Sequence, residues 1–469
     1  MHMLSAATGL ALPVLLGALW LGQLVPVGGA ARTVLVWGNG ALLGLLLLPQ
    51  LMLGLDGLGI PLTFLSTGSL ATALVVLALI SRLFVGKREN WTPAQANRQS
   101  AMTPLQKLLF IFCLLLIALR LATLGLEILG RPLFPWDATT HWATKAKVWF
   151  EYHRIVPFVR KGEWLALGGA GVFTDLHPDY PSTIPLLQVW MNLALGQWNT
   201  SLMNLPWLLC LAALGCAFYA QLRIAGLNAV LAIVFTYLLL SMPLLNIHVA
   251  LAGYADLFLG AAYCCALMAF HNWVTTRQRW QALLALFFAI ACPLIKDEGL
   301  IWLLTFVPAH AVLMMSKREA AKLFLLFSLL LVLLFLVAPD DLVIAGHPID
   351  HLAPTFHAEG ITGIVQSVWL HDNWHLLGYL LLVVIPLGLF MPGAMTGTYL
   401  EISIALGAAV AGFLFLFLFT GFGVAASDFT GVGRLSIQLA PGLLFLGALL
   451  CNELLARDGV GTRPAGRTA

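Results

Sequence analysis

Three side chains able to do chemistry are spaced four residues apart in one early polar segment. Asp137, His141 and Lys145 lie in the run Pro-Trp-Asp-Ala-Thr-Thr-His-Trp-Ala-Thr-Lys. Positions i, i+4 and i+8 share one face of an α-helix, so the spacing predicts an amphipathic helix on the membrane surface, with Asp137 at its start. A carboxylate placed there can take a proton from a hydroxyl, and a nearby cation can bind an anion. Two plainer interpretations stay open: the charges face water, or Asp137 caps the helix.

The same polar segment closes on a second group of candidate residues. His177, Asp179 and Tyr180 lie in the run His-Pro-Asp-Tyr-Pro. The whole segment, 129–183, is long for a connection between membrane spans, and long loops commonly carry function. We therefore expect substrate-binding side chains in it.

Charged residues also interrupt the apolar segments later in the chain. Some lie where an apolar segment begins and some in the turn between two such segments. They are Asp256, Lys296, Asp297, Glu298 and Arg434. A charge beside hydrocarbon costs about 2.5–3.5 kcal/mol even on lenient insertion scales, so each needs a partner or a function. Taken singly, a solvated turn or a snorkelling anchor explains each residue as well. Their predicted position on one side of the membrane favours a shared site.

The composition determines the class of protein. Hydrophobic residues make up 60% of the 469 residues and charged residues 10%, against about 25% charged in a typical soluble domain. The mean hydropathy is +0.93. A soluble protein of this size would need several cores with almost no charged surface. We therefore predict an all-α polytopic membrane protein.

Fourteen apolar segments are candidate spans, and the basic residues orient them. The segments are 8–28, 34–54, 66–86, 106–128, 184–198, 201–222, 226–246, 251–272, 281–296, 299–316, 321–338, 376–392, 400–422 and 436–455. Loops rich in Lys and Arg mark the cytoplasmic side, which leaves 129–183 and 339–375 on the opposite side. Successive spans must alternate between the two sides of the membrane, and the segments within 184–250 do not fit this alternation. One segment there is therefore interfacial, re-entrant or merged. We expect 13 spans, with 14 as the alternative.

Several short motifs together resemble the GT-C membrane glycosyltransferases. The nearest branch is the protein O-mannosyltransferase and aminoarabinose transferase type, which uses polyprenyl-phosphate sugars. Residues 106–455 carry the resemblance, through Trp-Asp-Ala at 136–138, His-Pro-Asp-Tyr-Pro-Ser at 177–182, Gly-Tyr-Ala-Asp at 253–256, Leu-Ile-Lys-Asp-Glu-Gly at 294–299 and Gly-Arg-Leu at 433–435. Asn204 is a departure, because relatives often carry Arg before the Leu-Pro pair.

The resemblance implies a domain organisation. The whole chain would form a GT-C-like bundle of about 13 transmembrane helices, in which residues 106–455 are the catalytic domain, with amphipathic helices in the external catalytic loop 129–183 and a further external loop at 339–375. Residues 1–105 would be extra N-terminal helices with a cytoplasmic loop, and 456–469 a cytoplasmic tail. The expected location is a bacterial inner membrane, with the active site facing the periplasm.

The resemblance also implies an activity. A sugar would move from a polyprenyl-phosphate donor to a hydroxyl acceptor on a lipid, a glycan or a protein, with Asp137 as the general base. The residues expected to bind substrate are His141, Lys145, Tyr180, Lys296, Glu298 and Arg434. Arg434 would hold the donor phosphate, because a guanidinium binds phosphate oxygens in a fork. A nucleotide-binding Gly-rich loop is absent from the sequence, as expected for a lipid-linked donor, and no nucleic-acid partner is expected.

A divalent cation is a further expectation. Asp256 with His177 or Asp179 could hold Mg²⁺ or Mn²⁺ against the phosphate, because hard carboxylate ligands suit these ions. The alternative is that Arg and Lys alone neutralise the leaving group. The histidines of the loop 339–375 match no standard metal-ligand spacing.

Two other functions remain in view. A lipid-linked glycan transporter or flippase would show two similar halves with interrupted spans, and no such symmetry is visible. An O-antigen ligase or polymerase would place its large functional loop late in the chain. The only late candidate is 339–375, which contains no Lys or Arg.

Overall fold

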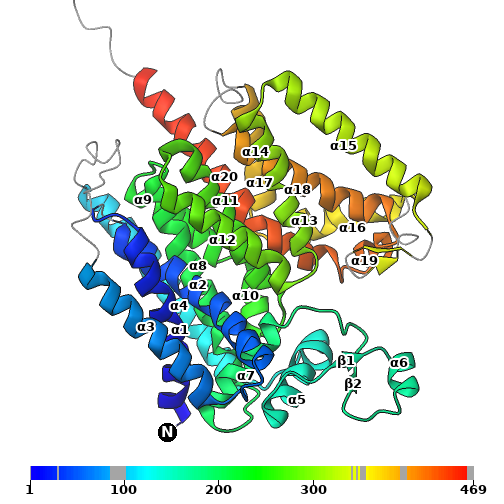
Figure 1. The fold of residues 1–469 in the computed structure, drawn as a ribbon. Helices are drawn as coiled ribbons and strands as arrows, with labels where there is room; N and C mark the ends of the chain where they lie inside the picture. Colours follow the sequence, from blue (N-terminus) through cyan, green and yellow to red (C-terminus); the bar gives the residue numbers. More distant parts are fainter. Residues whose placement is uncertain are drawn as a thin grey trace, which may run out of the picture.

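The fold is a bundle of helices with a small polar lobe at one end (Figure 1). The structure, a computed structural model, describes residues 2–28, 31–84, 102–339, 342–344, 347–348, 355–390 and 399–461. The first four helices are α1 (His2–Leu24), α2 (Arg32–Gly57), α3 (Phe64–Phe84) and α4 (Pro104–Gly130). The lobe contains a π-helical turn (Ala138–Ala143), α5 (Thr144–Tyr152), α6 (Lys161–Ala166) and the parallel strands β1 (Phe158–Val159) and β2 (Phe173–Thr174).

The rest of the chain is again mostly helical. It continues with α7 (Thr183–Leu195), a 3₁₀ turn (Leu202–Asn204), α8 (Leu205–Ile224), α9 (Ala229–Leu240), α10 (Pro243–Ala250), α11 (Asp256–Thr276), α12 (Arg279–Ile295), α13 (Gly299–Leu304), α14 (Phe306–Met314) and α15 (Lys317–Val337). After the antiparallel strands β3 (Val343–Ile344) and β4 (His347–Pro348) come α16 (Ala358–Val365), a π-helical turn (Gln366–Leu370), α17 (Leu377–Phe390), α18 (Leu400–Phe419), α19 (Gly423–Ser427) and α20 (Val432–Gly461).

The number of membrane spans differs from the sequence prediction. Within the described ranges eight helices are long and apolar enough to cross a membrane, or nine if α9 and α10, bent by 57°, form one span. Four further apolar helices have only 10–17 residues, fewer than the roughly 20 that a span requires. The predicted 13 spans, with 14 as the alternative, are therefore not confirmed. In the region 184–250, where the alternation of sides failed, α7 has only 13 residues, and the residue that follows it, Gly196, has a φ of 70°.

The helix α11 forms the centre of the bundle. The apolar window of α11 is 89% buried, and α11 packs against α8, α12 and α20 (Figure 1). At Gly260 a Cβ atom would lie 2.7 Å from the backbone oxygen of Ile437, so glycine allows α11 and α20 to approach closely. This contact is one turn from Asp256 and three residues from Arg434, and it brings the two charged helix starts together.

The polar lobe is held to the bundle by the apolar side of its first helix. Trp142, Ala146 and Trp149 are each less than 5% exposed, and α5 packs against α7. These three residues are the apolar stripe of an amphipathic helix, and protein covers them. They therefore do not contact lipid, and the placement of this helix on the membrane surface stays a prediction.

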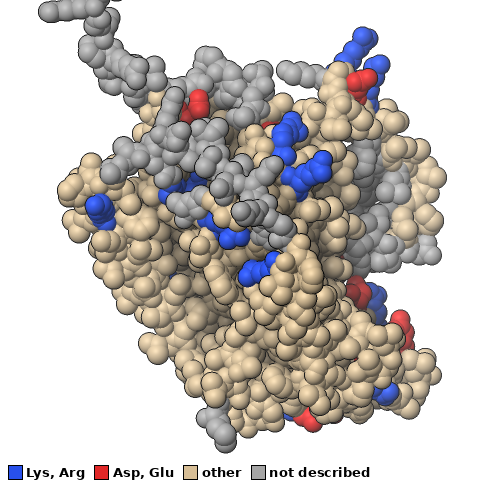
Figure 2. Space-filling model, turned by 60° about the vertical axis from the view of Figure 1, so that its left-hand side comes forward, with Lys and Arg blue, Asp and Glu red and all other residues tan. Residues whose placement is uncertain are grey.

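Charges are unevenly distributed over the surface. Figure 2 shows one face with a broad uncharged area, and most of its Lys and Arg side chains gather in the upper half. A broad uncharged surface suits contact with hydrocarbon. The fold thus supports a multi-pass membrane protein.

Candidate active site

A buried carboxylate at the start of α11 is the centre of a charge network. Asp256 is 0% exposed, and its Oδ1 accepts hydrogen bonds from Lys296 Nζ at 3.0 Å and Gln438 Nε2 at 2.8 Å. Its Oδ2 accepts from Arg434 Nε at 3.0 Å. Trp302 Nε1 donates to Gln438 Oε1 at 2.6 Å and holds that amide in place. A carboxylate this deeply buried is tolerable because two cations and an amide satisfy both of its oxygens.

Arg434, near the start of α20, joins two carboxylates that are far apart in sequence. Its Nε contacts Asp256, its Nη1 forms an ion pair with Asp137, and its guanidinium carbon lies 4.9 Å from the centre of the Tyr254 ring. The side chain is 24% exposed, and Nη2 has no hydrogen-bond partner among the described residues. One edge of the guanidinium is therefore free to bind an anion.

The two glycines beside Arg434 allow close packing of the chain at the start of α20. A Cβ atom at Gly431 would lie 3.0 Å from the Phe417 ring, and one at Gly433 would lie 3.3 Å from Leu244. They let this segment pack against its own neighbours, and neither has a positive φ.

Asp137 reaches the site because a glycine allows two segments to touch. Gly253 has a φ of +110°, and a Cβ atom there would lie 2.6 Å from the Cβ of Ala138. This close approach places Asp137 beside the start of α11. The Asp137 side chain makes no capping hydrogen bond, and its 25% exposed carboxylate pairs with Arg434. The helix-cap interpretation is therefore wrong for this residue.

His141 and Lys145 lie at a second, separate cluster around Asp175. His141 Nδ1 lies 2.5 Å from Asp175 Oδ1, and Lys145 Nζ lies 3.1 Å from Asp175 Oδ2. Lys145 Nζ also donates to the backbone oxygen of His177 at 2.6 Å. Their side chains are 7% and 1% exposed, so the interpretation that they face water is wrong. The predicted common face is thus divided: Asp137 turns to Arg434, while His141 and Lys145 turn to Asp175.

Burial and close contacts determine the protonation behaviour of this second cluster. Burial alone would raise the pKa of Asp175, but the backbone N–H of His177 and the Lys145 and His141 contacts outweigh it and lower the pKa. Burial lowers the pKa of Lys145, while Asp175 acts in the opposite direction. Burial and neighbouring His141 lower the pKa of His177. A carboxylate kept ionised by such contacts fixes the side chains around it.

Tyr180 lies between the two clusters. Its ring stacks on Trp142 at 4.9 Å and on His177 at 4.6 Å between ring centres. Burial and the carboxylate of Glu298 raise its pKa, and Arg434 partly opposes this rise. The hydroxyl therefore stays protonated and can donate a hydrogen bond.

The turn between α12 and α13 supplies the remaining charges. Lys296 is 2% exposed and also pairs with Glu298 Oε1 at 2.9 Å, whereas Glu298 Oε2 is buried without a hydrogen-bond partner among the described residues. Burial and the carboxylates of Glu298 and Asp179 raise the pKa of Asp297 to about 6. Asp297 can therefore hold or release a proton near neutral pH.

The three residues expected to bind a metal occupy different surroundings. Asp256 is surrounded by two cations and an amide, the His177 ring stacks on Tyr180, and Asp179 is exposed. Among the described residues, no three His, Cys, Asp or Glu side chains are grouped so that they could hold a metal ion. Of the late histidines, His357 pairs with Glu359, and His351 lies outside the described residues.

Sequence reasoning missed two residues that organise the site. Gln438 lies four residues after Arg434 inside an apolar helix, and a polar residue in that position is a signal that could have found it. Asp175 lies in Phe-Thr-Asp-Leu, where nothing in the sequence distinguishes it from a solvated loop residue.

No known protein family, curated protein or solved structure matches this chain. A functional argument must therefore come from the site itself.

Proposed function

We propose that this protein is a membrane glycosyltransferase that moves a sugar from a polyprenyl-phosphate donor to a hydroxyl acceptor on the non-cytoplasmic face. One observation carries the proposal. Arg434 joins Asp137 and Asp256 at the surface of a membrane bundle, and its Nη2 has no hydrogen-bond partner in the part of the chain that the structure describes. A phosphate-binding cation and a candidate base are thus adjacent, where a lipid phosphate and a polar acceptor can meet.

The leaving phosphate would bind at Arg434. A phosphate oxygen can first bind Nη2 of Arg434. A second phosphate oxygen then replaces Asp137 at Nη1, which gives the bidentate fork that a guanidinium favours. Asp256 keeps Arg434 in place by accepting a hydrogen bond from Nε, and Lys296 adds positive charge by binding the other oxygen of Asp256. These groups would stabilise negative charge as it grows on the phosphate.

Asp137 would act as the base once the phosphate has displaced it from Arg434. The acceptor oxygen attacks the anomeric carbon, and its proton passes to the Asp137 carboxylate. The bond from that carbon to the phosphate oxygen breaks, and its electron pair leaves with the lipid phosphate. Direct attack of this kind inverts the anomeric configuration. The donor would have to bind first, because its phosphate must separate the Asp137 carboxylate from Arg434 before that carboxylate can reach the acceptor hydroxyl.

Two further groups are suited to sugar hydroxyls. Glu298 Oε2, which is buried and has no hydrogen-bond partner within the described ranges, can accept a hydrogen bond, and the protonated Tyr180 hydroxyl can donate one. For His141 and Lys145 we propose a positioning role: through Asp175 they hold the segment that carries His177 and Tyr180.

We propose that Arg434 and Lys296, and not Mg²⁺ or Mn²⁺, neutralise the phosphate. Asp256, the expected metal ligand, already binds both cations. Exhaustive EDTA treatment should therefore leave the rate unchanged. Loss of activity that Mg²⁺ or Mn²⁺ restores would return the divalent ion to the mechanism.

Purified protein incubated with polyprenyl-phosphate sugars tests the activity directly. A transferase releases the lipid phosphate in the presence of an acceptor, whereas a flippase moves the intact lipid across a vesicle membrane without releasing it. A ligase or polymerase would instead require a diphosphate-linked glycan. Release from a monophosphate donor is the outcome expected here.

The proposed location is a bacterial inner membrane with the site facing the periplasm.

A further inference from the structure

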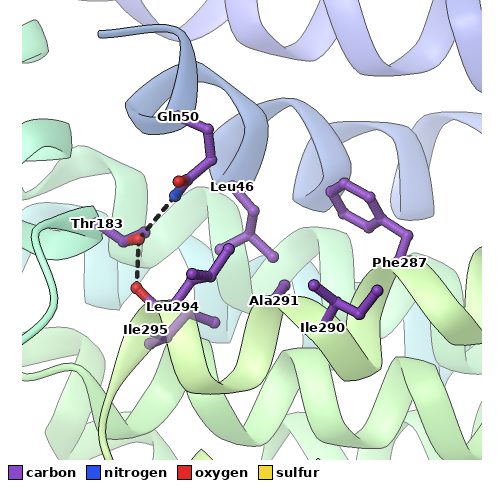
Figure 3. A pocket seen from close by; sticks show the side chains of 8 residues that line it. All are labelled: Leu46, Gln50, Thr183, Phe287, Ile290, Ala291, Leu294 and Ile295. Atoms are coloured by element: carbon purple, nitrogen blue, oxygen red, sulfur yellow. Dashed lines mark hydrogen bonds between the residues drawn. The ribbon is translucent and has the colours of Figure 1, made fainter. Parts of the chain in front are cut away.

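An apolar cavity lies beside the charged site, between α2, α7 and α12 (Figure 3). Its volume is about 110 Å³. The apolar lining comes from Leu46 of α2 and from Phe287, Ile290, Ala291 and Leu294 of α12. An apolar cavity of about 150 Å³ can hold a benzene molecule, so this one suits a branched group of about five carbons.

Two polar side chains line the cavity at the end nearest the charged site. Gln50 Nε2 donates to Thr183 Oγ1 at 3.1 Å, and Thr183 Oγ1 donates to the backbone oxygen of Leu294 at 2.5 Å (Figure 3). These bonds tie α2 and the start of α7 to the end of α12. The cavity therefore lies where hydrogen bonds join the three helices that line it.

The position of the cavity connects hydrocarbon to the phosphate site. Ile290 and Leu294 are 48% and 42% exposed on the outer side of α12, so the cavity is open on the side that would face lipid. At its other end Ile295 lines the cavity, and the next residue is Lys296, which binds Asp256. A lipid with its phosphate at the charged site would have the first carbons of its chain at this cavity.

We propose that the cavity binds an isoprenoid unit of the lipid-phosphate donor, close to the phosphate. The inference rests on the proposed function, because that function supplies the donor. It extends the substrate site to α2, one of the N-terminal helices that precede the catalytic bundle. A branched chain with methyl groups fills a wide, short cavity better than a straight acyl chain does, so the cavity favours isoprenoid over diacyl lipid.

A matched pair of variants on one helix face tests the proposal. Ile290→Trp fills the cavity. Leu286→Trp adds the same ring one turn earlier, at a residue that is 56% exposed and does not line the cavity. Ala291→Leu narrows the cavity from its inner wall and serves if Ile290→Trp fails to fold. The measurement is native mass spectrometry of delipidated protein titrated with polyprenyl phosphate, and separately with phosphatidylglycerol at equal mole fraction.

The wild type and Leu286→Trp should retain polyprenyl phosphate in preference to phosphatidylglycerol. Ile290→Trp or Ala291→Leu should weaken this retention about tenfold or more, as expected when several methylene equivalents lose their contacts. Equal retention by all variants, or equal retention of both lipids by the wild type, would overturn the proposal.

The test separates this proposal from the proposed activity, because no sugar is needed for binding. Selective binding that the variants weaken, without sugar transfer by any protein, would keep the cavity and reject the transferase. Sugar transfer with an unchanged KM for the donor in Ile290→Trp would keep the transferase and reject the cavity.

Discussion

Replacement of Arg434 by Lys separates a phosphate fork from a charged anchor. Arg434 contacts Asp256 through Nε and Asp137 through Nη1. A lysine ammonium is a single point charge, so it can keep one of these contacts but cannot present two parallel donors to a phosphate. If the residue only anchors the helix end, the substitution should have little effect on catalysis.

The structure indicates the size of the effects. Removing one partner of a buried ion pair costs about 3–5 kcal/mol. Asp256 would still have Lys296 and Gln438, and Arg434 is 24% exposed, so we expect about 3 kcal/mol for Arg434→Ala and roughly 1–2 kcal/mol for Arg434→Lys. Losing a donor aimed at developing negative charge should reduce the rate of lipid-phosphate release by about 10²–10³ fold.

The assay combines two measurements on the same detergent-purified protein. Thermal unfolding reports stability, and release of polyprenyl phosphate from a sugar-loaded donor reports turnover. Arg131→Lys is the control, because Arg131 forms an exposed ion pair with Glu127 at 2.7 Å at the end of α4. If Arg434→Lys folds normally and both Arg434 variants keep the donor affinity and rate of the wild type, Arg434 is not the phosphate site.

Three further outcomes follow from the described contacts. The pKa of Asp297 is raised to about 6, so this carboxyl group lowers the stability of the folded protein as the pH rises from about 4 through 6. Asp297→Asn should therefore stabilise the protein at pH 8 and not at pH 4. Equal shifts of the unfolding midpoint at both pH values would contradict this. Gly253→Ala should disturb the contact with Ala138 and slow turnover at least tenfold, about 1.4 kcal/mol, an effect that an unchanged rate would exclude. Cysteine at Gly162 should react with an impermeant thiol reagent in intact cells, and cysteine at Arg318 only after permeabilisation; the reverse pattern would move the site to the cytoplasm.

The convergence of distant charges could be predicted from the sequence, because a charge at the edge of hydrocarbon needs a partner. Asp256, Lys296 and Arg434 each interrupt an apolar segment, and the cost of leaving such a charge alone is several times the thermal energy. Sidedness predicted that they would share one face with Asp137. The structure brings these four side chains into one network.

Partners inside the polar loop could not be predicted. The spacing of His141 and Lys145 indicates a common helix face, but it does not reveal what covers that face. Their partner, Asp175, is 30 residues or more further along the chain and was identified only through the fold.

The number of spans could not be predicted from the sequence either. Hydropathy reveals an apolar segment, but the length of the helix depends on where turns interrupt it. The segment 184–198 folds as a helix of 13 residues, and 226–246 as a helix pair bent by 57°.

Replacement of Asp137 by Asn tests the central claim most directly. Asn has nearly the same size, and its oxygen can still accept a hydrogen bond from Arg434, but it cannot take a proton from the acceptor. The account predicts a loss of about 10²–10⁴ fold in lipid-phosphate release, the usual worth of a general base, with normal expression and unfolding temperature. Asp428→Asn, at an exposed residue of the last loop, is the matched control and should remain active. An Asp137→Asn protein that keeps more than about a tenth of the wild-type rate would contradict the account.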